Sequence, residues 1–177
     1  SLSAHKFNGP KGIGVLYMKN GTPFEPLITG GGQERQKRSG TENIAFISAA
    51  AQAIQLAEDE KKQLCLNLTK LKNKIINELK QNHPEIILNG HSSQSLPNII
   101  NLTIPNIRAD DLISALDIED VCISNGSACT SNSLEPSHVL QAIGISANLA
   151  LNTIRISLGR YNFENEIIQF LIIIDKI

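Results

Sequence analysis

The longest pattern in the sequence is helical: it begins near Thr41 and continues to about Gln81, just before His83 and Pro84. Apolar residues recur on one face at the three- and four-residue spacing of an α-helix. These positions are Ile44, Ile47, Ala51, Ile54, Leu64, Leu68, Leu71, Ile75 and Leu79. We expect Thr41 to cap the N-terminus of this helix. Because an unbroken helix of this length would extend about 60 Å, we predict a break or bend near Asp59-Glu60.

Shorter apolar runs lie on both sides of this helix. Residues 12–18 predict a strand entered through glycines, and Leu27-Ile28 a second extended piece. After Pro84 the pattern alternates between strand and helix spacing. It predicts strands at Ile86–Leu88, Asn98–Ile104, Val121–Ser124 and Thr153–Leu158, and helices at Asp110–Leu116, Pro136–Ile143 and Glu164–Lys176. This mixture indicates a small α+β layer domain. We expect a boundary near residue 60 or 85 and adopt the domains 1–60 and 61–177.

Composition and charge exclude several classes of protein. Of the 177 residues, 41% are hydrophobic and 19% charged, a globular and not a disordered balance. The net charge of −1 gives no basic field for nucleic acid. Three cysteines without a CxxC pair argue against a disulfide framework and a structural zinc site. The longest apolar run, Phe170 to Ile174, is far shorter than the roughly 20 residues that span a bilayer. We expect a protein of the cytoplasm or an organelle matrix, without a membrane or nucleic-acid partner.

The first candidate for chemistry is the run Ser3-Ala4-His5-Lys6, which a glycine-rich turn follows. A lysine amine can form a Schiff base with an aldehyde cofactor. Ser3 and His5 could hold a phosphate beside it. By itself the four-residue run is a weak signal and more typical of a surface turn.

The second candidate is a glycine-rich loop, Gly30-Gly31-Gly32-Gln33-Glu34, followed by Arg38-Ser39-Gly40-Thr41 at the start of the long helix. Backbone amides in such a loop bind anions, and the Thr41 hydroxyl would add a donor. A flexible loop with an ordinary helix cap would explain the same residues.

The third candidate is Cys129, which lies among small polar residues from Ser124 to Ser131. Such a stretch is typical of an exposed, mobile loop, where functional groups concentrate. A reactive thiol needs this kind of access. By contrast, Cys65 falls in the helical stripe and Cys122 in an apolar strand, so we expect both to be buried and inert.

The fourth candidate is Arg155, which alternates with apolar neighbours on a predicted strand. An arginine in that position needs a dedicated partner, because an unpaired buried charge is costly. The partner is either a substrate carboxylate, gripped bidentately, or a structural carboxylate of the protein.

Together these four blocks resemble the cysteine desulfurase family of the NifS/IscS type, which is class-V-aminotransferase-like and depends on pyridoxal phosphate. Ser-Ala-His-Lys with its glycine turn resembles the cofactor-lysine segment. Gly-Gly-Gly-Gln-Glu…Arg-Ser-Gly-Thr is similar to a phosphate loop. Asn-Gly-Ser-Ala-Cys-Thr-Ser is similar to the cysteine loop, in which the family has Ser for Asn125. Ile-Arg-Ile-Ser-Leu-Gly-Arg resembles the substrate-arginine strand, and all four stand in family order.

The resemblance implies an α/β protein of fold-type I and a homodimer. It implies that Lys6 forms the Schiff base with pyridoxal 5'-phosphate and carries protons. Ser3 and His5 would hold the cofactor phosphate, and Thr41 the phosphate of the other subunit. Arg155 would bind the carboxylate of L-cysteine. Cys129 would take the sulfur as a persulfide, leaving L-alanine.

The same resemblance implies where the sulfur goes. The persulfide would pass to an iron–sulfur scaffold protein or to a sulfur-relay protein for tRNA thiolation. No resident metal is implied, although Cys129 would contact iron–sulfur clusters transiently during transfer.

The resemblance covers roughly the second half of such an enzyme, namely the end of the large cofactor domain (1–60) and a small α+β domain with the cysteine loop (61–177). The family's aspartate on the pyridine nitrogen, its ring-stacking residue and its first phosphate loop would all precede residue 1. We therefore expect the chain alone to bind the cofactor poorly.

Two other interpretations stay open. One is a selenocysteine lyase or another relative with the same fold, which the Gly-Ser-Ala-Cys-Thr-Ser loop disfavours. The other is a truncated, non-enzymatic chain, or one piece of a split enzyme that needs an N-terminal half.

Overall fold

The computed structural model describes residues 1–91, 93–125 and 136–177. The chain divides into two compact units, Ser1–Lys62 and Gln63–Ile177, and one long helix contributes to both. Each unit is described by itself below.

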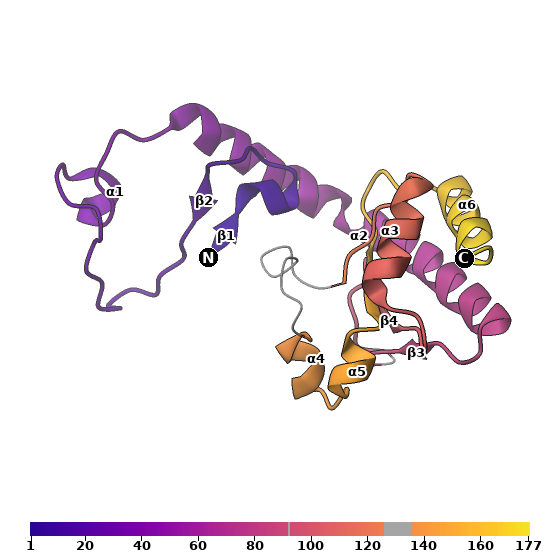
Figure 1. Cartoon of the computed structure of the whole chain (residues 1–177). Coiled ribbons are helices and arrows are strands. Elements are labelled where there is room, and N and C mark those ends of the chain that lie inside the picture. The colour runs from indigo at the N-terminus through magenta and orange to yellow at the C-terminus, as the bar shows by residue number, and fades with distance from the viewer. Residues whose placement is uncertain (92, 126–135) are drawn as a thin grey trace. The chain divides into compact units, whose positions relative to one another are not determined.

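The first unit begins with a tight hairpin (Figure 1). Strand β1 (Leu2–Ser3) pairs antiparallel with β2 (Gly14–Val15), and the 3₁₀-helix η1 (Ala4–Phe7) lies between them. The chain can turn back sharply because its glycines leave room: a Cβ at Gly14 would lie 2.8 Å from the Leu2 carbonyl oxygen. The strand predicted over residues 12–18 is therefore reduced to two residues, since only Leu2 and Ser3 are available to pair with it. The expected extended piece at Leu27-Ile28 is not a strand.

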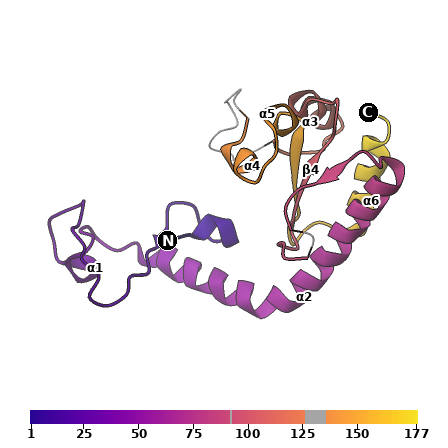
Figure 2. The same cartoon turned by 90° about the horizontal axis from the view of Figure 1, so that it is seen from below.

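Helix α2 (Ile44–Asn82) is one uninterrupted helix of 39 residues, as Figure 2 shows. Of the break or bend predicted near Asp59-Glu60, the break is absent, because the helix continues through both residues. Glu60 favours helix, and both charged side chains are exposed, so neither requires an interruption. The predicted cap was also wrong: the Asn43 side chain, and not Thr41, accepts the backbone N–H of Phe46 at 3.2 Å. Asn and Thr are both good caps, and the chain begins its first turn after Asn43.

The second unit is built on a three-stranded antiparallel sheet in the order β3-β4-β5. Its strands are β3 (Ile87–Leu88), β4 (Ile99–Thr103) and β5 (Thr153–Ser157), which agree with three predicted strands. The described helices after α2 are α3 (Ala109–Ile118), α4 (His138–Ala142), α5 (Ala147–Ala150) and α6 (Glu164–Ile174). Three of them were predicted, and the short α5 was missed. The fourth predicted strand is reduced to a single bridge at Ser124.

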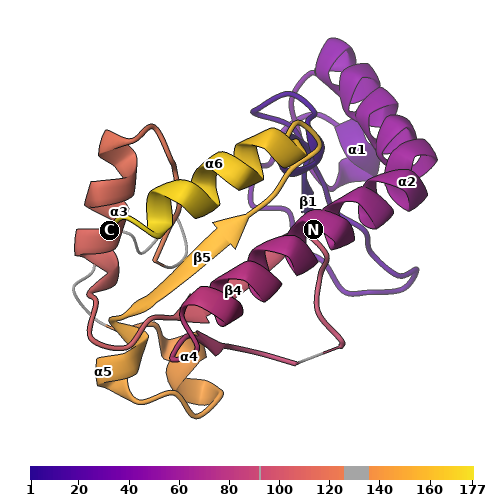
Figure 3. The same ribbon diagram turned by 90° about the vertical axis from the view of Figure 1, so that its right-hand side faces the viewer.

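The core lies on one face of this sheet. Alternation along β4 and β5 directs Ile100, Leu102, Ile154 and Ile156 to that face, where all four are buried. Apolar residues of α2, α3 and α6 complete the same cluster. Figure 3 shows α6 and the C-terminal part of α2 running side by side. Lys74 of α2 joins Glu164 of α6 at 2.8 Å; this hydrogen bond lowers the pKa of Glu164 and raises that of Lys74.

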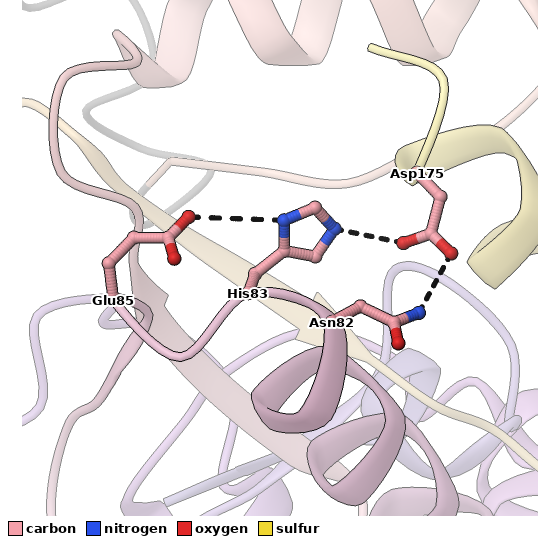
Figure 4. A network of polar contacts seen from close by, with 4 residues as sticks. All are labelled: Asn82, His83, Glu85 and Asp175. Carbon is pink, nitrogen blue, oxygen red and sulfur yellow. Dashed lines mark hydrogen bonds and ion pairs between the residues drawn. The ribbon is translucent and has the colours of Figure 1, made fainter.

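The ends of α2 and α6 are joined by a second polar contact (Figure 4). His83 Nε2 lies 2.9 Å from a carboxylate oxygen of Asp175, whose other oxygen accepts from Asn82 at 2.9 Å. Glu85 lies on the other side of the ring, 3.9 Å from Nδ1. These contacts fix the C-terminal turn of α6, where Asp175 caps the helix.

Lys72 is an unusual buried charge in α2, with only 8% of its surface exposed. Its ammonium donates to Ser95 Oγ at 2.9 Å, to the Leu96 carbonyl at 2.8 Å and to the Ile99 carbonyl at 2.9 Å. Burial lowers the pKa of Lys72. The three oxygen acceptors offset the cost of burying the charge and hold the segment before β4 against the helix.

Replacing Lys72 with Met should destabilise the protein by about 2 kcal/mol, because three oxygen acceptors would lose their donor in a half-buried place. The free energy of unfolding from urea titrations measures this. The matched control is Lys70→Met on the exposed side of the same helix, which should change stability by less than about 0.5 kcal/mol. Equal losses in the two variants would contradict the role given to Lys72.

No described helix is both long enough and apolar enough to cross a membrane.

Candidate functional site

The Ser3–Lys6 segment is exposed on the surface of the first unit. Ala4 is buried, while Ser3, His5 and Lys6 are exposed. Ser3 precedes η1 in an extended conformation, and Lys6 lies within η1. The turn after Lys6 is tight: Asn8 is left-handed, and Gly9 donates to the Ala4 carbonyl at 2.9 Å. The hairpin therefore presents a hydroxyl and an amine at its surface.

The glycine loop is closed by two side chains. Ser39 is buried and its hydroxyl donates to the Gly31 carbonyl at 2.7 Å, while Gln33 Oε1 accepts from the Gly40 N–H at 3.1 Å. The loop contains the single turn α1 (Gln33–Gln36), which the sequence did not predict. Three consecutive residues, Glu34 to Gln36, have φ values of 50°, 56° and 63°. That left-handed conformation costs roughly 1–2 kcal/mol for each residue with a side chain, so the loop needs the two closing hydrogen bonds.

Thr41 lies beyond this loop, exposed and ahead of the first turn of α2. Because Asn43 caps the helix, the Thr41 hydroxyl is not needed as the cap. The structure thus leaves Thr41 accessible at the junction of the glycine loop and the helix.

Arg155 lies in the middle of β5, on the face opposite the apolar core. It is half-buried, and its Nε is buried without a hydrogen-bond partner among the described residues. Neither a carboxylate nor a carbonyl of the described chain pairs with this nitrogen, so the structural salt bridge considered above does not satisfy it. A buried donor without an acceptor costs about 1–3 kcal/mol. It is well suited to an acceptor supplied from outside the chain.

The backbone of Arg155 is held on two sides. On one side it stands opposite Asn101 in the β4–β5 register. On the other it bridges Ser124, whose N–H donates to the Arg155 carbonyl at 3.2 Å. The next residue, Asn125, donates to an Asp110 carboxylate oxygen at 2.6 Å. The start of the cysteine segment is therefore anchored next to Arg155, while Cys129 itself lies outside the described residues.

The polar face around Arg155 carries a group of side chains that the sequence analysis missed. Asn89 Nδ2 donates to Asn101 Oδ1 and to Thr103 Oγ1, both at 2.8 Å. Thr103 and Thr153 are fully buried, with their hydroxyls 2.7 Å apart. An asparagine such as Asn101 is uncommon in a strand of isoleucine and leucine. That residue was the one feature of the sequence that could have indicated this polar group.

The other two cysteines are exposed, and the prediction that they are buried was wrong. Cys65 is exposed although its neighbours in α2, Leu64 and Leu68, pack on the core. Cys122 lies between Val121 and Ile123, which pack on the core, so alternation turns its thiol outward. Among the described residues no group of three or more His, Cys, Asp or Glu could hold a metal ion.

These residues fit an aldehyde cofactor with a phosphate. Lys6 offers the amine, Ser3, His5 and Thr41 offer polar groups of the kind that bind phosphate, and all four are accessible. The unsatisfied Nε of Arg155 fits a carboxylate.

The whole length of the chain is similar to known proteins. Residues 1–170 match the family model described as Aminotransferase class-V. The chain belongs to this family. It is 44% identical to the cysteine desulfurase IscS of Dictyoglomus turgidum over 177 residues, all of this chain and 45% of that protein. It is 40% identical to the cysteine desulfurase of Rattus norvegicus over 169 residues, 94% of this chain and 37% of that one.

Solved structures of class-V relatives give the same result. A structure titled NifS-like protein superposes with a TM-score of 0.87 at 38% identity, covering 98% of this chain and 44% of that one. A structure titled SspA in complex with cysteine gives a TM-score of 0.63 at 36% identity, covering 92% of this chain and 44% of that one. The predicted family and the fold-type I class are thereby confirmed. The chain spans less than half the length of the relatives it matches.

Proposed function

We propose that the chain is part of a cysteine desulfurase that converts L-cysteine to L-alanine and keeps the sulfur as a persulfide on Cys129. The relatives that match the whole chain carry the name cysteine desulfurase. The chain covers 45% of the length of the IscS relative. We therefore propose the activity for an enzyme that also contains the part of the relatives that this chain does not cover. Within it, residues 1–60 would belong to the large cofactor domain and 61–177 would form the small domain.

The N-terminal unit would hold pyridoxal phosphate. Lys6 would bond covalently to its aldehyde and move protons at the reacting carbon, while Ser3 and His5 would bind the phosphate. Thr41 would reach the phosphate in the second subunit of a homodimer. When bound, the cofactor supplies an electron sink next to the substrate.

The second unit would bind and attack the amino acid. Arg155 would grip the carboxylate of L-cysteine, because a guanidinium pairs with a carboxylate through two parallel hydrogen bonds. The Cys129 thiolate would attack the substrate sulfur: the new S–S bond forms as the substrate C–S bond breaks. A proton then completes the methyl group of alanine, so cysteine and thiol become alanine and persulfide without an external oxidant.

The observation that carries this proposal is the buried, unpaired Nε of Arg155 beside the Ser124 bridge. It supports an external carboxylate at Arg155, and the bridge ties the arginine strand to the segment that leads to Cys129. A nucleophile that must reach a carboxylate-bound substrate benefits from this fixed starting point.

Downstream, we propose that the persulfide passes to an iron–sulfur scaffold protein or to a sulfur-relay protein for tRNA thiolation. The compartment would be the cytoplasm or an organelle matrix. Incubating the enzyme with selenocysteine in place of cysteine separates the desulfurase from a selenocysteine lyase, since only the lyase would prefer selenocysteine.

The attachment of the cofactor is tested by borohydride reduction. The chain is combined with a polypeptide that covers the upstream part of its relatives, loaded with pyridoxal phosphate, reduced and mapped by mass spectrometry. We expect the label on Lys6, which lies in η1 directly after Ser3 and His5, and not on Lys11 in the turn that follows. A label on Lys11, or on neither lysine, would contradict the assignment.

A further inference from the structure

The residue paired with Arg155 on the neighbouring strand β4 is Asn101. The two residues are directly opposite each other in the β4–β5 register. Side chains at opposite positions on one face lie close enough to interact. An asparagine oxygen at this place is the natural internal acceptor for a guanidinium, yet Arg155 Nε is buried without a partner.

The reason lies in how Asn101 is held. Its Oδ1 accepts from Asn89 Nδ2 at 2.8 Å, and its own Nδ2 donates to the Ile154 carbonyl at 3.2 Å. Asn89 is fixed in turn, because its backbone N–H donates to the Asn101 carbonyl at 3.0 Å and its side chain also donates to Thr103. The amide of Asn101 is thus engaged through both its oxygen and its nitrogen.

We propose that Asn89 and Asn101 are positioning residues that keep the Arg155 guanidinium free for an external carboxylate. Asn89 and the Ile154 carbonyl together fix the orientation of the Asn101 amide, and its oxygen is held on Asn89. In the free protein the Nε–H of Arg155 therefore lacks an acceptor, which is energetically unfavourable. A bound ligand carboxylate supplies that acceptor. That difference between the free and bound states strengthens carboxylate binding.

The inference rests on the proposed function for the identity of the ligand, L-cysteine. Its structural part, that Asn89 withholds an acceptor from Arg155, stands independently and can be measured without turnover.

The decisive variant is Asn101→Asp in the enzyme reconstituted with the upstream part. It keeps the shape of the side chain and places a carboxylate opposite Arg155. We expect the KM for L-cysteine to rise about tenfold or more with kcat nearly unchanged, because the new ion pair must be broken before substrate binds. Asn89→Ala should raise the KM several-fold by releasing the Asn101 oxygen, and adding Asn101→Val should restore it.

The matched control is Asn67→Ala, which removes an asparagine hydrogen bond to Gln63 on the exposed side of α2. It should leave the KM unchanged. If Asn101→Asp and Asn89→Ala leave the KM at the wild-type value, or if the double variant is worse than Asn89→Ala alone, the proposal is wrong.

A second measurement separates this proposal from the proposed function. The Nε–H resonance of Arg155 in a ¹⁵N spectrum, assigned by its absence in Arg155→Lys, should move in Asn101→Asp to the position of a carboxylate-bound group. If that shift occurs but the wild type neither binds nor turns over L-cysteine, the positioning role holds and the proposed function fails. An unchanged resonance overturns the positioning role whatever the activity.

Discussion

Replacing Cys129 with Ser is expected to abolish persulfide formation in the reconstituted enzyme while leaving the fold and the cofactor spectrum intact. Serine has nearly the size of cysteine but no sulfur nucleophile. The thiol has a usable thiolate fraction of a few per cent at neutral pH, whereas the hydroxyl has essentially none. The measurement is labelling of the persulfide after incubation with L-cysteine, followed by peptide mapping.

The controls for this experiment are Cys65→Ser and Cys122→Ser. Both thiols are exposed, so we expect both variants to change stability by less than about 0.5 kcal/mol and to keep the chemistry. Persulfide found on the Cys129→Ser variant would refute the mechanism. So would a complete loss of label in Cys122→Ser while the protein stays folded.

Replacing Arg155 with Lys is expected to raise the KM for L-cysteine by about a hundredfold. A lysine keeps the positive charge but lacks the planar fork that binds both carboxylate oxygens. Losing a charge-assisted hydrogen bond costs roughly 1.5–3 kcal/mol, which corresponds to about ten- to hundredfold in affinity. The measurement is steady-state kinetics of alanine release.

Arg108→Lys is the matched control, because Arg108 is an exposed arginine whose carboxylate neighbour, Asp110, is 3.7 Å away. It should leave the KM unchanged. If Arg155→Lys binds L-cysteine as tightly as the wild type does, Arg155 is not the carboxylate-binding residue, and its unpaired Nε needs another explanation.

The two predictions test different parts of the proposal. Cys129 decides whether sulfur is transferred to the protein, and Arg155 decides whether the amino acid is held. Loss of the first with retention of the second would describe a protein that binds cysteine without desulfurating it.

The elements with strong periodicity were predictable. The apolar residues of α2 from Leu64 to Leu79 and the alternation in β4 and β5 each direct one set of side chains to a single core. The N-terminal part of the predicted stripe, Ile44, Ile47 and Ile54, is exposed. Local repeats of this kind determine an element almost regardless of what lies around it. The four motif blocks were predictable for the same reason, since each is contiguous in the sequence.

The errors occurred where the element depends on a partner. The strand predicted at 12–18 pairs only with Leu2 and Ser3, so it is two residues long. The strand predicted at 121–124 makes only a single bridge, between Ser124 and Arg155. The sequence pattern also does not distinguish Thr41 from Asn43 as the N-cap of α2, because threonine and asparagine are both favourable N-cap residues. The exposure of Cys65 and Cys122 was also decided by the fold, because it depends on which side of each segment packs against the core.

By itself the sequence determined the family, the long helix, the alternating strands and the residues able to do chemistry, because these are properties of short runs. Only the tertiary structure decided that Asn89, Asn101, Thr103 and Thr153 form one hydrogen-bonded group across three segments. It alone also decided that Lys72 has three oxygen acceptors, whereas Arg155 Nε has none among the residues that the structure describes. Whether a buried polar group is satisfied depends on atoms that are distant in the chain, and folding is what brings them within hydrogen-bond distance.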